Sequence, residues 1–391
     1  MTDPVADTLV VLPSVRVVPR GDRVFMDIKM VEGLSLYAAL WNGPVRCLAR
    51  AGPPHEIGYG RDYALADLPF ALEIIDEEAA SCGTALAGAA VVLAAGDNHR
   101  DFAVVDISPA PVVFIIEYTL ATRLRIVLLE MGRSVAALKA AVWTVVTERK
   151  RRRAFRRSAG LQANGDPAFA AYRGLVPTTL RYFDSRMRDD QQIAARELAT
   201  KQAAMRAGAP LRLAFSGRLE AMKGADHLVP VAAALRARGV AFTLDIYGDG
   251  SLREEIDHAI RDAGLADIVT LRGAVDFDDA LIPALQAGAD LFLCCHRQAD
   301  PSCTYLETLS CGVPIIGYDN AAFLGVLGLG AVGVATPMDR PDAAAAAIAA
   351  LDGDRARLAA MADVAARIGR DNSFETTFAA RIAQLRSVAA R

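Results

Sequence analysis

Two cations stand five residues apart in a glycine-bounded loop in the second half of the chain. Arg218 and Lys223 lie in the sequence SGRLEAMKG, residues 216–224, between an apolar run and an alanine-rich stretch. A diphosphate requires clustered cations together with backbone N–H groups that can approach it closely. The loop is therefore a candidate diphosphate site, and a pair of solvated surface cations is the alternative interpretation.

A short turn with two glycines comes next along the chain. The sequence YGDGS, residues 247–251, stands where an expected strand passes into an expected helix. Glycine permits either a tight turn with positive φ or the close approach of a ligand to the backbone, and both interpretations of Gly248 stay open. The glycines are too few for the fingerprint of a dinucleotide-binding loop.

A third polar segment, residues 296–307, follows an apolar run. Its sequence DPS at 300–302 predicts the start of a helix, with Ser302 or Thr304 as the cap. Glu307 would then lie one turn into that helix, where its carboxylate could accept two hydrogen bonds from a ribose diol. A first-turn glutamate that favours the helix dipole is the alternative.

A parallel sheet would bring these three segments to one edge. Short apolar runs alternate with longer amphipathic stretches over most of the chain, which is typical of parallel sheets covered by helices, and ligands bind such sheets at the carboxyl ends of their strands. The strands expected in the second half are Leu211–Ser216, Phe242–Tyr247, Ile268–Leu271, Leu291–Cys295 and Pro314–Tyr318. The helices expected there are Ala225–Arg238, Ser251–Ala263, Leu281–Ala287 and Thr304–Cys311.

The first half shows the same alternation and predicts a second sheet. Its expected strands are Val24–Met30, Val45–Ala49, Ala89–Ala94, Pro111–Ile116 and Leu161–Asn164. Leu124–Arg157 predicts a helix broken near Gly132. A length of 391 residues favours two domains. We place their connection at Gln191–Gly208, giving an N-terminal domain over 1–205 and a C-terminal domain over 206–391 whose last helix is a candidate to pack back on the first domain.

Composition narrows the class of protein. Apolar residues make up 53% and charged residues 23%, which describes a globular α/β chain, and the net charge of -3 indicates no polyionic partner for the whole molecule. Six cysteines without a CxxC pair favour free thiols in a reducing compartment over a metal site. Neither a signal peptide nor a run of ~18 apolar residues is seen, so we expect a cytoplasmic protein, with attachment to a membrane surface left open.

Taken together, the three segments resemble the sugar-nucleotide site of the large retaining glycosyltransferase family that includes bacterial lipopolysaccharide, mannolipid and sucrose-type transferases. The resemblance covers Leu211 to about Gly317 in order and spacing. It implies a GT-B fold, two Rossmann-like doubly wound domains in tandem with a cleft between them. It also implies that Arg218 and Lys223 bind the diphosphate of a UDP-, GDP- or ADP-sugar and that Glu307 binds its ribose, with no cofactor and no metal.

The resemblance implies further contacts through the backbone. The chain around Arg272 and Gly273 would lie against the nucleobase, and the amides of Ser302, Cys303 and Thr304 would face the sugar and phosphate.

One position departs from the family's pattern. The family commonly carries a second glutamate eight residues before the one that corresponds to Glu307, where it contacts the transferred sugar. This chain has Ala299 there, followed by Asp300. Either Asp300 has taken over the role, or the sugar is held differently.

The first domain offers weaker candidates. By the same resemblance, Gly33 occupies the place of a glycine-rich loop after the first strand, and Glu117 replaces a histidine that often follows a later strand. Glu117 could act as a base towards the acceptor hydroxyl or hydrogen-bond the sugar, and a strand-end glutamate without a catalytic role is the alternative. His99, which ends another apolar run, is the other candidate for that role.

The stretch from Arg123 to Arg157 carries eleven Lys or Arg residues against two acids, interleaved with apolar residues that include Trp143. A basic helix with an apolar face suits an anionic membrane surface. A packed helix with a solvated end is the alternative, and nucleic acid is disfavoured because no recognised binding module accompanies the charge.

The sequence thus favours retaining transfer of a hexose from a nucleotide diphosphate sugar to a hydroxyl of a lipid-linked or surface-glycan acceptor. A sugar-nucleotide epimerase or phosphorylase of the same architecture remains a rival. A relative that binds the nucleotide sugar without turnover is the other, and Ala299 favours it.

Overall fold

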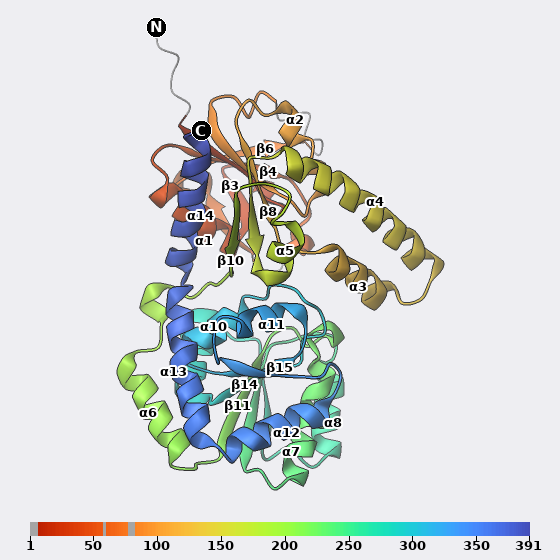
Figure 1. Ribbon diagram of the computed structural model, residues 1–391, viewed down its shortest axis with the longest axis vertical. Coiled ribbons are helices and arrows are strands. Elements are labelled where there is room, and N and C mark those ends of the chain that lie inside the picture. Colours follow the sequence, from red (N-terminus) through yellow and green to blue (C-terminus); the bar gives the residue numbers. More distant parts are fainter. Residues whose placement is uncertain (1–6, 58–59, 77–82) are drawn as a thin grey trace. The chain divides into compact units, whose positions relative to one another are not determined.

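Two parallel sheets, each with its own covering helices, organise the chain (Figure 1). The computed structural model describes residues 7–57, 60–76 and 83–391. Unit 1 comprises the chain up to Tyr182 together with Glu375–Arg391, and unit 2 comprises Phe183–Phe374. Both units have the Rossmann-like α/β architecture that the sequence predicts.

The main sheet of unit 1 has the strand order β10-β9-β8-β7-β1-β4-β6, and all of its pairings are parallel. Its strands are β1 (Thr8–Leu12), β4 (Val45–Arg50), β6 (Ala71–Ile75), β7 (Ala89–Ala95), β8 (Val112–Ile116), β9 (Gly160–Asn164) and β10 (Thr179–Tyr182). A small antiparallel sheet consists of β2 (Val18–Arg20), β3 (Arg23–Asp27) and β5 (Gly60–Ala64). The helices are α1 (Ile28–Leu40), α2 (Val104–Ile107), α3 (Leu120–Met131), α4 (Val135–Arg157), α5 (Gly165–Tyr172) and α14 (Phe374–Ala389).

Unit 2 is built on a sheet with the order β13-β12-β11-β14-β15-β16, again all parallel. Its strands are β11 (Leu211–Ser216), β12 (Phe242–Tyr247), β13 (Val269–Gly273), β14 (Leu291–Cys294), β15 (Ile315–Tyr318) and β16 (Gly333–Thr336). Its helices are α6 (Ala195–Arg206), α7 (Leu228–Ala237), α8 (Arg253–Asp262), α9 (Ile282–Gly288), α10 (Thr304–Ser310), α11 (Ala321–Leu327), α12 (Pro341–Asp352) and α13 (Arg355–Asp371).

Alternation along the central strand β11 shows why unit 2 needs helices on both faces. Leu213 and Phe215 belong to a buried cluster that includes residues of α7, α8 and α12. Ala214, between them, belongs to a second cluster that includes residues of α9, α10 and α11. Because successive side chains of a strand point to opposite faces, the sheet is buried on both sides.

The first strand of unit 1 differs from the expected one. The expected strand Val24–Met30 is split, because β3 pairs antiparallel with β2 and β5 and a helix begins at Ile28. The Asp27 side chain caps that helix by accepting a hydrogen bond from the backbone N–H of Met30 at 3.0 Å. The first strand of the main sheet is instead β1, which the sequence analysis did not single out.

The connection between the units lies earlier than Gln191–Gly208. Most of that segment is helix α6, which packs on α13 within unit 2, and Gln202 donates a hydrogen bond to the carbonyl of Ala359 at 2.8 Å. Unit 2 therefore begins at Phe183. The last helix, α14, is part of unit 1 from Glu375 onward, where Arg381 and Gln162 exchange hydrogen bonds of 2.9 and 3.0 Å.

The expected break near Gly132 is confirmed. Gly132 ends α3 with φ of 59°, and the Ser134 side chain caps the start of α4. A hairpin of two helices results, and among the described residues no helix is long and apolar enough to cross a membrane.

A buried carboxylate fixes the inner end of α4 to the sheet of unit 1. Glu148, 4% exposed, accepts hydrogen bonds from Arg123 at 3.1 Å, Arg151 at 2.8 Å, Arg152 at 2.8 Å and the Tyr172 hydroxyl at 3.1 Å. Buried charges are stable only when they are paired and hydrogen-bonded. The cluster therefore holds α3, α4 and α5 together.

Glu148→Gln is expected to lower the free energy of unfolding by about 3–5 kcal/mol, because it leaves Arg151 buried without its counter-charge. Asp257→Asn is the matched control, since it weakens the exposed Arg261–Asp257 pair of α8 and should cost less than about 1 kcal/mol. Urea unfolding followed by circular dichroism measures both free energies of unfolding. Equal losses of stability in the two variants would contradict the role of Glu148 as a buried counter-charge.

Candidate functional site

The carboxyl ends of four neighbouring strands in unit 2 carry the candidate residues. Strands β13, β12, β11 and β14 are adjacent and parallel, so the segments that follow them open at one edge of the sheet. Ser216, the last residue of β11, pairs with Tyr247, which pairs in turn with Gly273. Brought together in this way, the three polar segments form one candidate site.

Hydrogen bonds join the first two segments, residues 216–224 and 247–252, to each other. Leu219 donates its backbone N–H to Asp249 at 2.9 Å and accepts one from Leu252 at 3.0 Å. The carboxylate of Glu220 accepts from both the N–H and the hydroxyl of Ser251, at 3.1 and 2.7 Å, and these bonds lower the pKa of Glu220. The neighbouring segment 247–252 therefore fixes the conformation of the loop between Arg218 and Lys223.

Glycines are required where the segments cross closely. A Cβ on Gly248, whose φ is 128°, would stand 1.9 Å from the carbonyl oxygen of Gly217. A Cβ on Gly224, with φ of 64°, would stand 2.0 Å from the carbonyl oxygen of Cys295. The Gly248 N–H donates to Gly273 at 2.8 Å, so packing alone accounts for the glycine at 248.

Lys223 and Asp300 form an ion pair at the centre of the site. The buried Lys223 ammonium donates to Asp300 Oδ2 at 2.9 Å. Burial raises the pKa of Asp300, but Lys223 and then His296 lower that pKa further than burial raises it. The net shift is downward, so the carboxylate is charged at neutral pH. The ammonium has three donors, and the other two are available for a second partner.

Several polar atoms around this pair lack hydrogen-bond partners among the described residues. They are Asp300 Oδ1, Gln298 Oε1 and both ring nitrogens of His296. Burial, followed by the charge of Lys223, lowers the pKa of His296 to about 3. The imidazole is therefore neutral at physiological pH and can only donate and accept hydrogen bonds. These unpartnered buried atoms are positioned to hydrogen-bond a polar ligand or water.

Arg297 fixes the loop after β14 through ion pairs, although the sequence analysis did not single it out. Its guanidinium bonds both oxygens of Asp226, at 2.7 and 2.8 Å, and Asp339 at 2.6 Å. Its backbone N–H donates to Met222 at 3.0 Å, which ties the strand end directly to the residue before Lys223. The only sequence signal for Arg297 was its place next to a strand end. Its ion-pair partners could not be predicted, because they lie far away along the chain.

Arg218 is exposed and differs from the other cations of the site. Its guanidinium lies 3.9 Å from the sulfur of Met222, and no carboxylate within 4.0 Å of it is seen among the described residues. Arg272, also exposed, is paired with Asp245 at 2.7 Å, and Gly273 beside it has φ of 76°. Arg218 is thus the candidate cation most available to an anionic ligand.

Glu307 lies within α10 and faces Arg186 at 3.4 Å. The guanidinium of Arg186 stacks 3.8 Å from the centre of the Phe277 ring. Neither Ser302 nor Thr304 caps the helix as expected, because Cys303 holds the cap position and no side chain bonds there. The Ser302 N–H donates to the carbonyl of Asp300 at 2.8 Å, so this amide serves the loop itself.

The candidates from the first half lie in unit 1, and one is wrong. Gly33 lies inside helix α1 rather than in a loop, where a Cβ would meet the Phe378 ring at 3.0 Å, so close helix packing accounts for it. Glu117 follows β8, its N–H donates to Asp97 at 2.8 Å, and Asn164 donates to its carboxylate at 3.4 Å. His99 follows β7 and is exposed, with its ring 5.2 Å from that of Trp143 in an edge-to-face contact.

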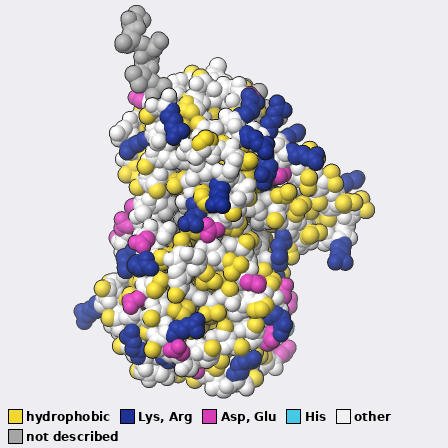
Figure 2. Space-filling view, in the orientation of Figure 1, with side chains coloured by type: hydrophobic (Ala, Val, Ile, Leu, Met, Phe, Trp, Pro, Cys, Tyr) yellow, Lys and Arg dark blue, Asp and Glu magenta, His cyan; other side chains and the backbone are white. Residues whose placement is uncertain are grey.

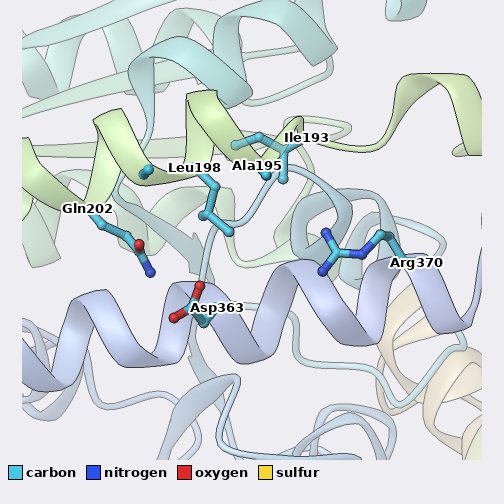
Figure 3. A pocket seen from close by; sticks show the side chains of 7 residues that line it. Ile193, Ala195, Leu198, Gln202, Asp363 and Arg370 are labelled. Atoms are coloured by element: carbon cyan, nitrogen blue, oxygen red, sulfur yellow. The ribbon is translucent and has the colours of Figure 1, made fainter.

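A separate hollow lies between α6 and α13 in unit 2 (Figure 3). It is lined by Ile193, Ala195, Leu198, Ala199, Gln202, Asp363 and Arg370. None of the candidate residues contributes to it, and its floor is the packing of one helix on the other. Among the five described cysteines, those at positions 47, 294, 295 and 311 are buried and form no disulfide. Cys303 is half-buried and its thiol donates to Asp184 Oδ2 at 3.5 Å, and Cys82 lies outside the described residues.

Gly248→Ala is expected to destabilise unit 2 by roughly 2 kcal/mol or more beyond Gly239→Ala, since only the first introduces a clash. Gly239 has φ of 73° with no atom near its hypothetical Cβ, so its substitution measures backbone strain alone. Thermal unfolding compares the two. A Gly248→Ala protein as stable as Gly239→Ala would show that the two segments do not cross this closely.

Comparison with known proteins finds a family that the C-terminal half of the chain resembles. Residues 200–367 match the family described as Glycosyl transferases group 1. The chain is 31% identical over 110 residues to the UDP-N-acetylglucosamine--peptide N-acetylglucosaminyltransferase GtfA subunit of Streptococcus gordonii, over 28% of this chain and 21% of that protein. It is 32% identical over 151 residues to the GDP-mannose-dependent alpha-(1-6)-phosphatidylinositol monomannoside mannosyltransferase of Mycobacterium tuberculosis, over 37% of this chain and 39% of that protein.

The solved structure of HepE from Anabaena in complex with UDP shares the fold over the whole length, with a TM-score of 0.66 at 16% identity and coverage of 97% of this chain and 99% of that one. At such identity the likeness shows the fold alone. The chain matches well under half the length of the two sequence relatives. Residues 200–367 are thus similar to the group 1 glycosyl transferases, and the chain as a whole shares the fold of HepE.

Proposed function

We propose that this protein transfers a hexose, with retention of anomeric configuration, from a nucleotide diphosphate sugar to a hydroxyl of an acceptor. The Lys223–Asp300 pair, with its unsatisfied polar neighbours, carries the proposal. One member of the pair suits a phosphate and the other suits sugar hydroxyls. Relatives named for UDP-N-acetylglucosamine and for GDP-mannose support a nucleotide sugar as donor.

The cations would stabilise the departing diphosphate. Arg218 is exposed and unpaired among the described residues, and Lys223 has donors to spare, so both can meet negative charge as it develops on the leaving group. We propose that these side chains replace a metal ion and that no cofactor is needed. In this mechanism the leaving phosphate helps to take the acceptor proton, which requires no protein nucleophile.

The remaining contacts to the donor nucleotide sugar are assigned to the segments that follow β13 and β14. Glu307 would accept hydrogen bonds from the ribose diol, and the backbone at Arg272 and Gly273 would lie against the base of a UDP-, GDP- or ADP-sugar. The amides of Cys303 and Thr304 would face the sugar and phosphate, while the amide of Ser302 already bonds Asp300.

Asp300 is the residue we assign to the sugar in place of the glutamate missing at Ala299. Ala299 packs against the buried cluster that includes α9, α10 and α11, so that position faces the core. Asp300 presents a charged carboxylate with one oxygen unpartnered beside the neutral His296. A carboxylate oxygen is a strong acceptor for a sugar hydroxyl.

The acceptor side is assigned to unit 1. Glu117, held at the end of β8 through Asp97, and the exposed His99 are both candidates for orienting the acceptor hydroxyl. We propose an acceptor that is lipid-linked or part of a surface glycan, and a place of action in the cytoplasm at the inner face of the membrane. Polysaccharide biosynthesis is the corresponding cellular role.

The nucleotide used is the one among UDP, GDP and ADP that raises the melting temperature of the unaltered protein most. Arg218→Ala is expected to weaken its binding by about tenfold or more, because an exposed cation is lost from the phosphate site. Arg357→Ala, which removes an exposed arginine from α13, is the matched control and should leave affinity unchanged. Titration calorimetry measures both. Unchanged affinity in Arg218→Ala would remove this loop from the donor site.

Asp300→Asn is expected to lower turnover about 100-fold, because the sugar contact contributes to the transition state. Since the substitution also removes the counter-charge of the buried Lys223, folding and nucleotide affinity are measured beside turnover. Asp267→Asn, an exposed residue before β13, is the control. Release of free nucleotide with an α-configured product, followed by NMR, supports retaining transfer. Isomerised donor without free nucleotide would show an epimerase, a sugar phosphate formed with inorganic phosphate would show a phosphorylase, and binding without turnover would show a non-catalytic relative.

A further inference from the structure

Exposed apolar side chains gather on one part of unit 1. Of the fourteen large hydrophobic residues found exposed among the described residues, nine lie between Leu128 and Val146. Val135 is 73% exposed, Leu138 66% and Trp143 56%. Figure 2 shows these side chains covering the arm formed by the α3–α4 hairpin, with Lys and Arg at its margins. Scattered exposed apolar residues are normal, but a contiguous patch marks a contact surface.

The pattern along α4 divides the exposed face into two zones. Val135, Leu138 and Val142 recur at spacings of three and four, followed by Val145 and Val146. Residues at such spacings share one face of a helix. The same face continues with Arg149, Arg153 and Arg156, all exposed. The exposed face is therefore mainly apolar at the outer end of the hairpin, where Arg133 and Lys139 are also exposed, and basic at the end nearer the sheet.

The opposite face of α4 shows which cations belong to this surface. Arg151 is buried, and with Arg123 and Arg152 it bonds the buried Glu148, so these three neutralise an internal carboxylate. Of the eleven cations from Arg123 to Arg157, these three therefore do not belong to the exposed basic surface. Glu148 is also the only acid among the described side chains of residues 120–157. The exposed face thus carries positive charge without exposed negative charge in its described part.

Charge decides what covers this face. A second copy of the chain would bring two sets of arginines together with no exposed acid among the described side chains of the hairpin to neutralise them, which is unfavourable. A surface with an apolar interior and a layer of negative charge meets both zones at once, and an anionic lipid bilayer has that composition.

We propose that the α3–α4 hairpin docks on an anionic bilayer with its apolar outer end among the acyl chains and Arg149, Arg153 and Arg156 at the lipid phosphates. From Val135 to Val146 the helix extends by about 16 Å, which exceeds the roughly 5–10 Å to which interfacial helices enter, so α4 lies obliquely in the interface. Trp143, 56% exposed, lies in the half of the apolar zone nearer the basic zone, with its ring 5.2 Å from that of His99. Tryptophan is favoured in membrane interfaces. The inference deepens the proposed membrane location and does not depend on the transfer chemistry.

The two tryptophans of the chain provide the test. Trp143 is exposed on the hairpin, whereas Trp41 is buried and donates its ring N–H to Asp7 at 2.7 Å, so Trp41 is an internal reference. With the full chain, phosphatidylcholine vesicles containing 30% phosphatidylglycerol should shift tryptophan emission to the blue, and brominated lipid should quench it. Pure phosphatidylcholine vesicles should bind far more weakly, by roughly fivefold for each cation that contacts lipid.

Paired substitutions separate the two zones. L138E together with V142E should abolish flotation with anionic vesicles, and R149E together with R153E should reduce it at least 25-fold, as two contacts of roughly fivefold each. Leu324→Glu, at an exposed apolar residue of α11, and Arg206→Glu, at an exposed arginine of α6, are the matched controls and should float like the unaltered protein. Circular dichroism and Trp41 emission verify folding.

Equal recovery with neutral and anionic vesicles, or flotation that survives both pairs of substitutions, would overturn the proposal. So would a dimer detected by light scattering without lipid and lost in the L138E and V142E protein, because a second copy would then cover the hairpin. Binding of soluble nucleotide is measured without vesicles. A protein that binds nucleotide but not vesicles would leave the proposed transfer standing and remove this inference alone.

Discussion

A buried ammonium requires a counter-charge, and the site in unit 2 is arranged around that requirement. Lys223 reaches Asp300 across two segments that follow neighbouring parallel strands. Removing two charges from water is costly unless each finds a partner, so the pair constrains both segments at once. The turn at Gly224, which admits the carbonyl of Cys295 only because it has no Cβ, is what allows the lysine to approach. The position of the candidate site therefore depends on one ion pair and one glycine.

The same physical rule organises unit 1 around a different residue. There an internal carboxylate, Glu148, gathers three arginines and a tyrosine hydroxyl, and Arg123 extends the cluster to Asp97 at 2.9 Å. Asp97 in turn holds the backbone of Glu117. A charged cluster thus fixes the base of the helical hairpin and the strand end that carries the acceptor-side candidates. The outer part of the hairpin, beyond this cluster, is where the exposed apolar side chains gather.

Local pattern predicted most of unit 2 but less of unit 1. Leu211–Ser216 and Phe242–Tyr247 are strands with the expected bounds, because each is a short apolar run with clear breaks on both sides. In unit 1 the choice between Thr8–Leu12 and Val24–Met30 as first strand depends on pairing with β4 and β7, which no local pattern contains. The placement of Gly33 in a loop was wrong because it depended on Val24–Met30 being the first strand. Arg297 was missed for a similar reason, since its partners Asp226 and Asp339 lie 71 and 42 residues away.

The resemblance implies a glutamate at position 299, where this chain has Ala299, and the Lys223–Asp300 pair lies directly beside that position. A glutamate at 299 would need to leave the buried cluster on which Ala299 packs, whereas Asp300 is already directed at the ammonium. Because Asp300 uses one oxygen for Lys223 and keeps the other unpartnered, the same carboxylate can orient the lysine and accept from a ligand. Lys223 likewise retains donors for a phosphate. Under the proposed transfer, groups suited to the two sides of a sugar–phosphate bond would be held 2.9 Å apart before any ligand arrives, which is the preorganisation that electrostatic catalysis requires.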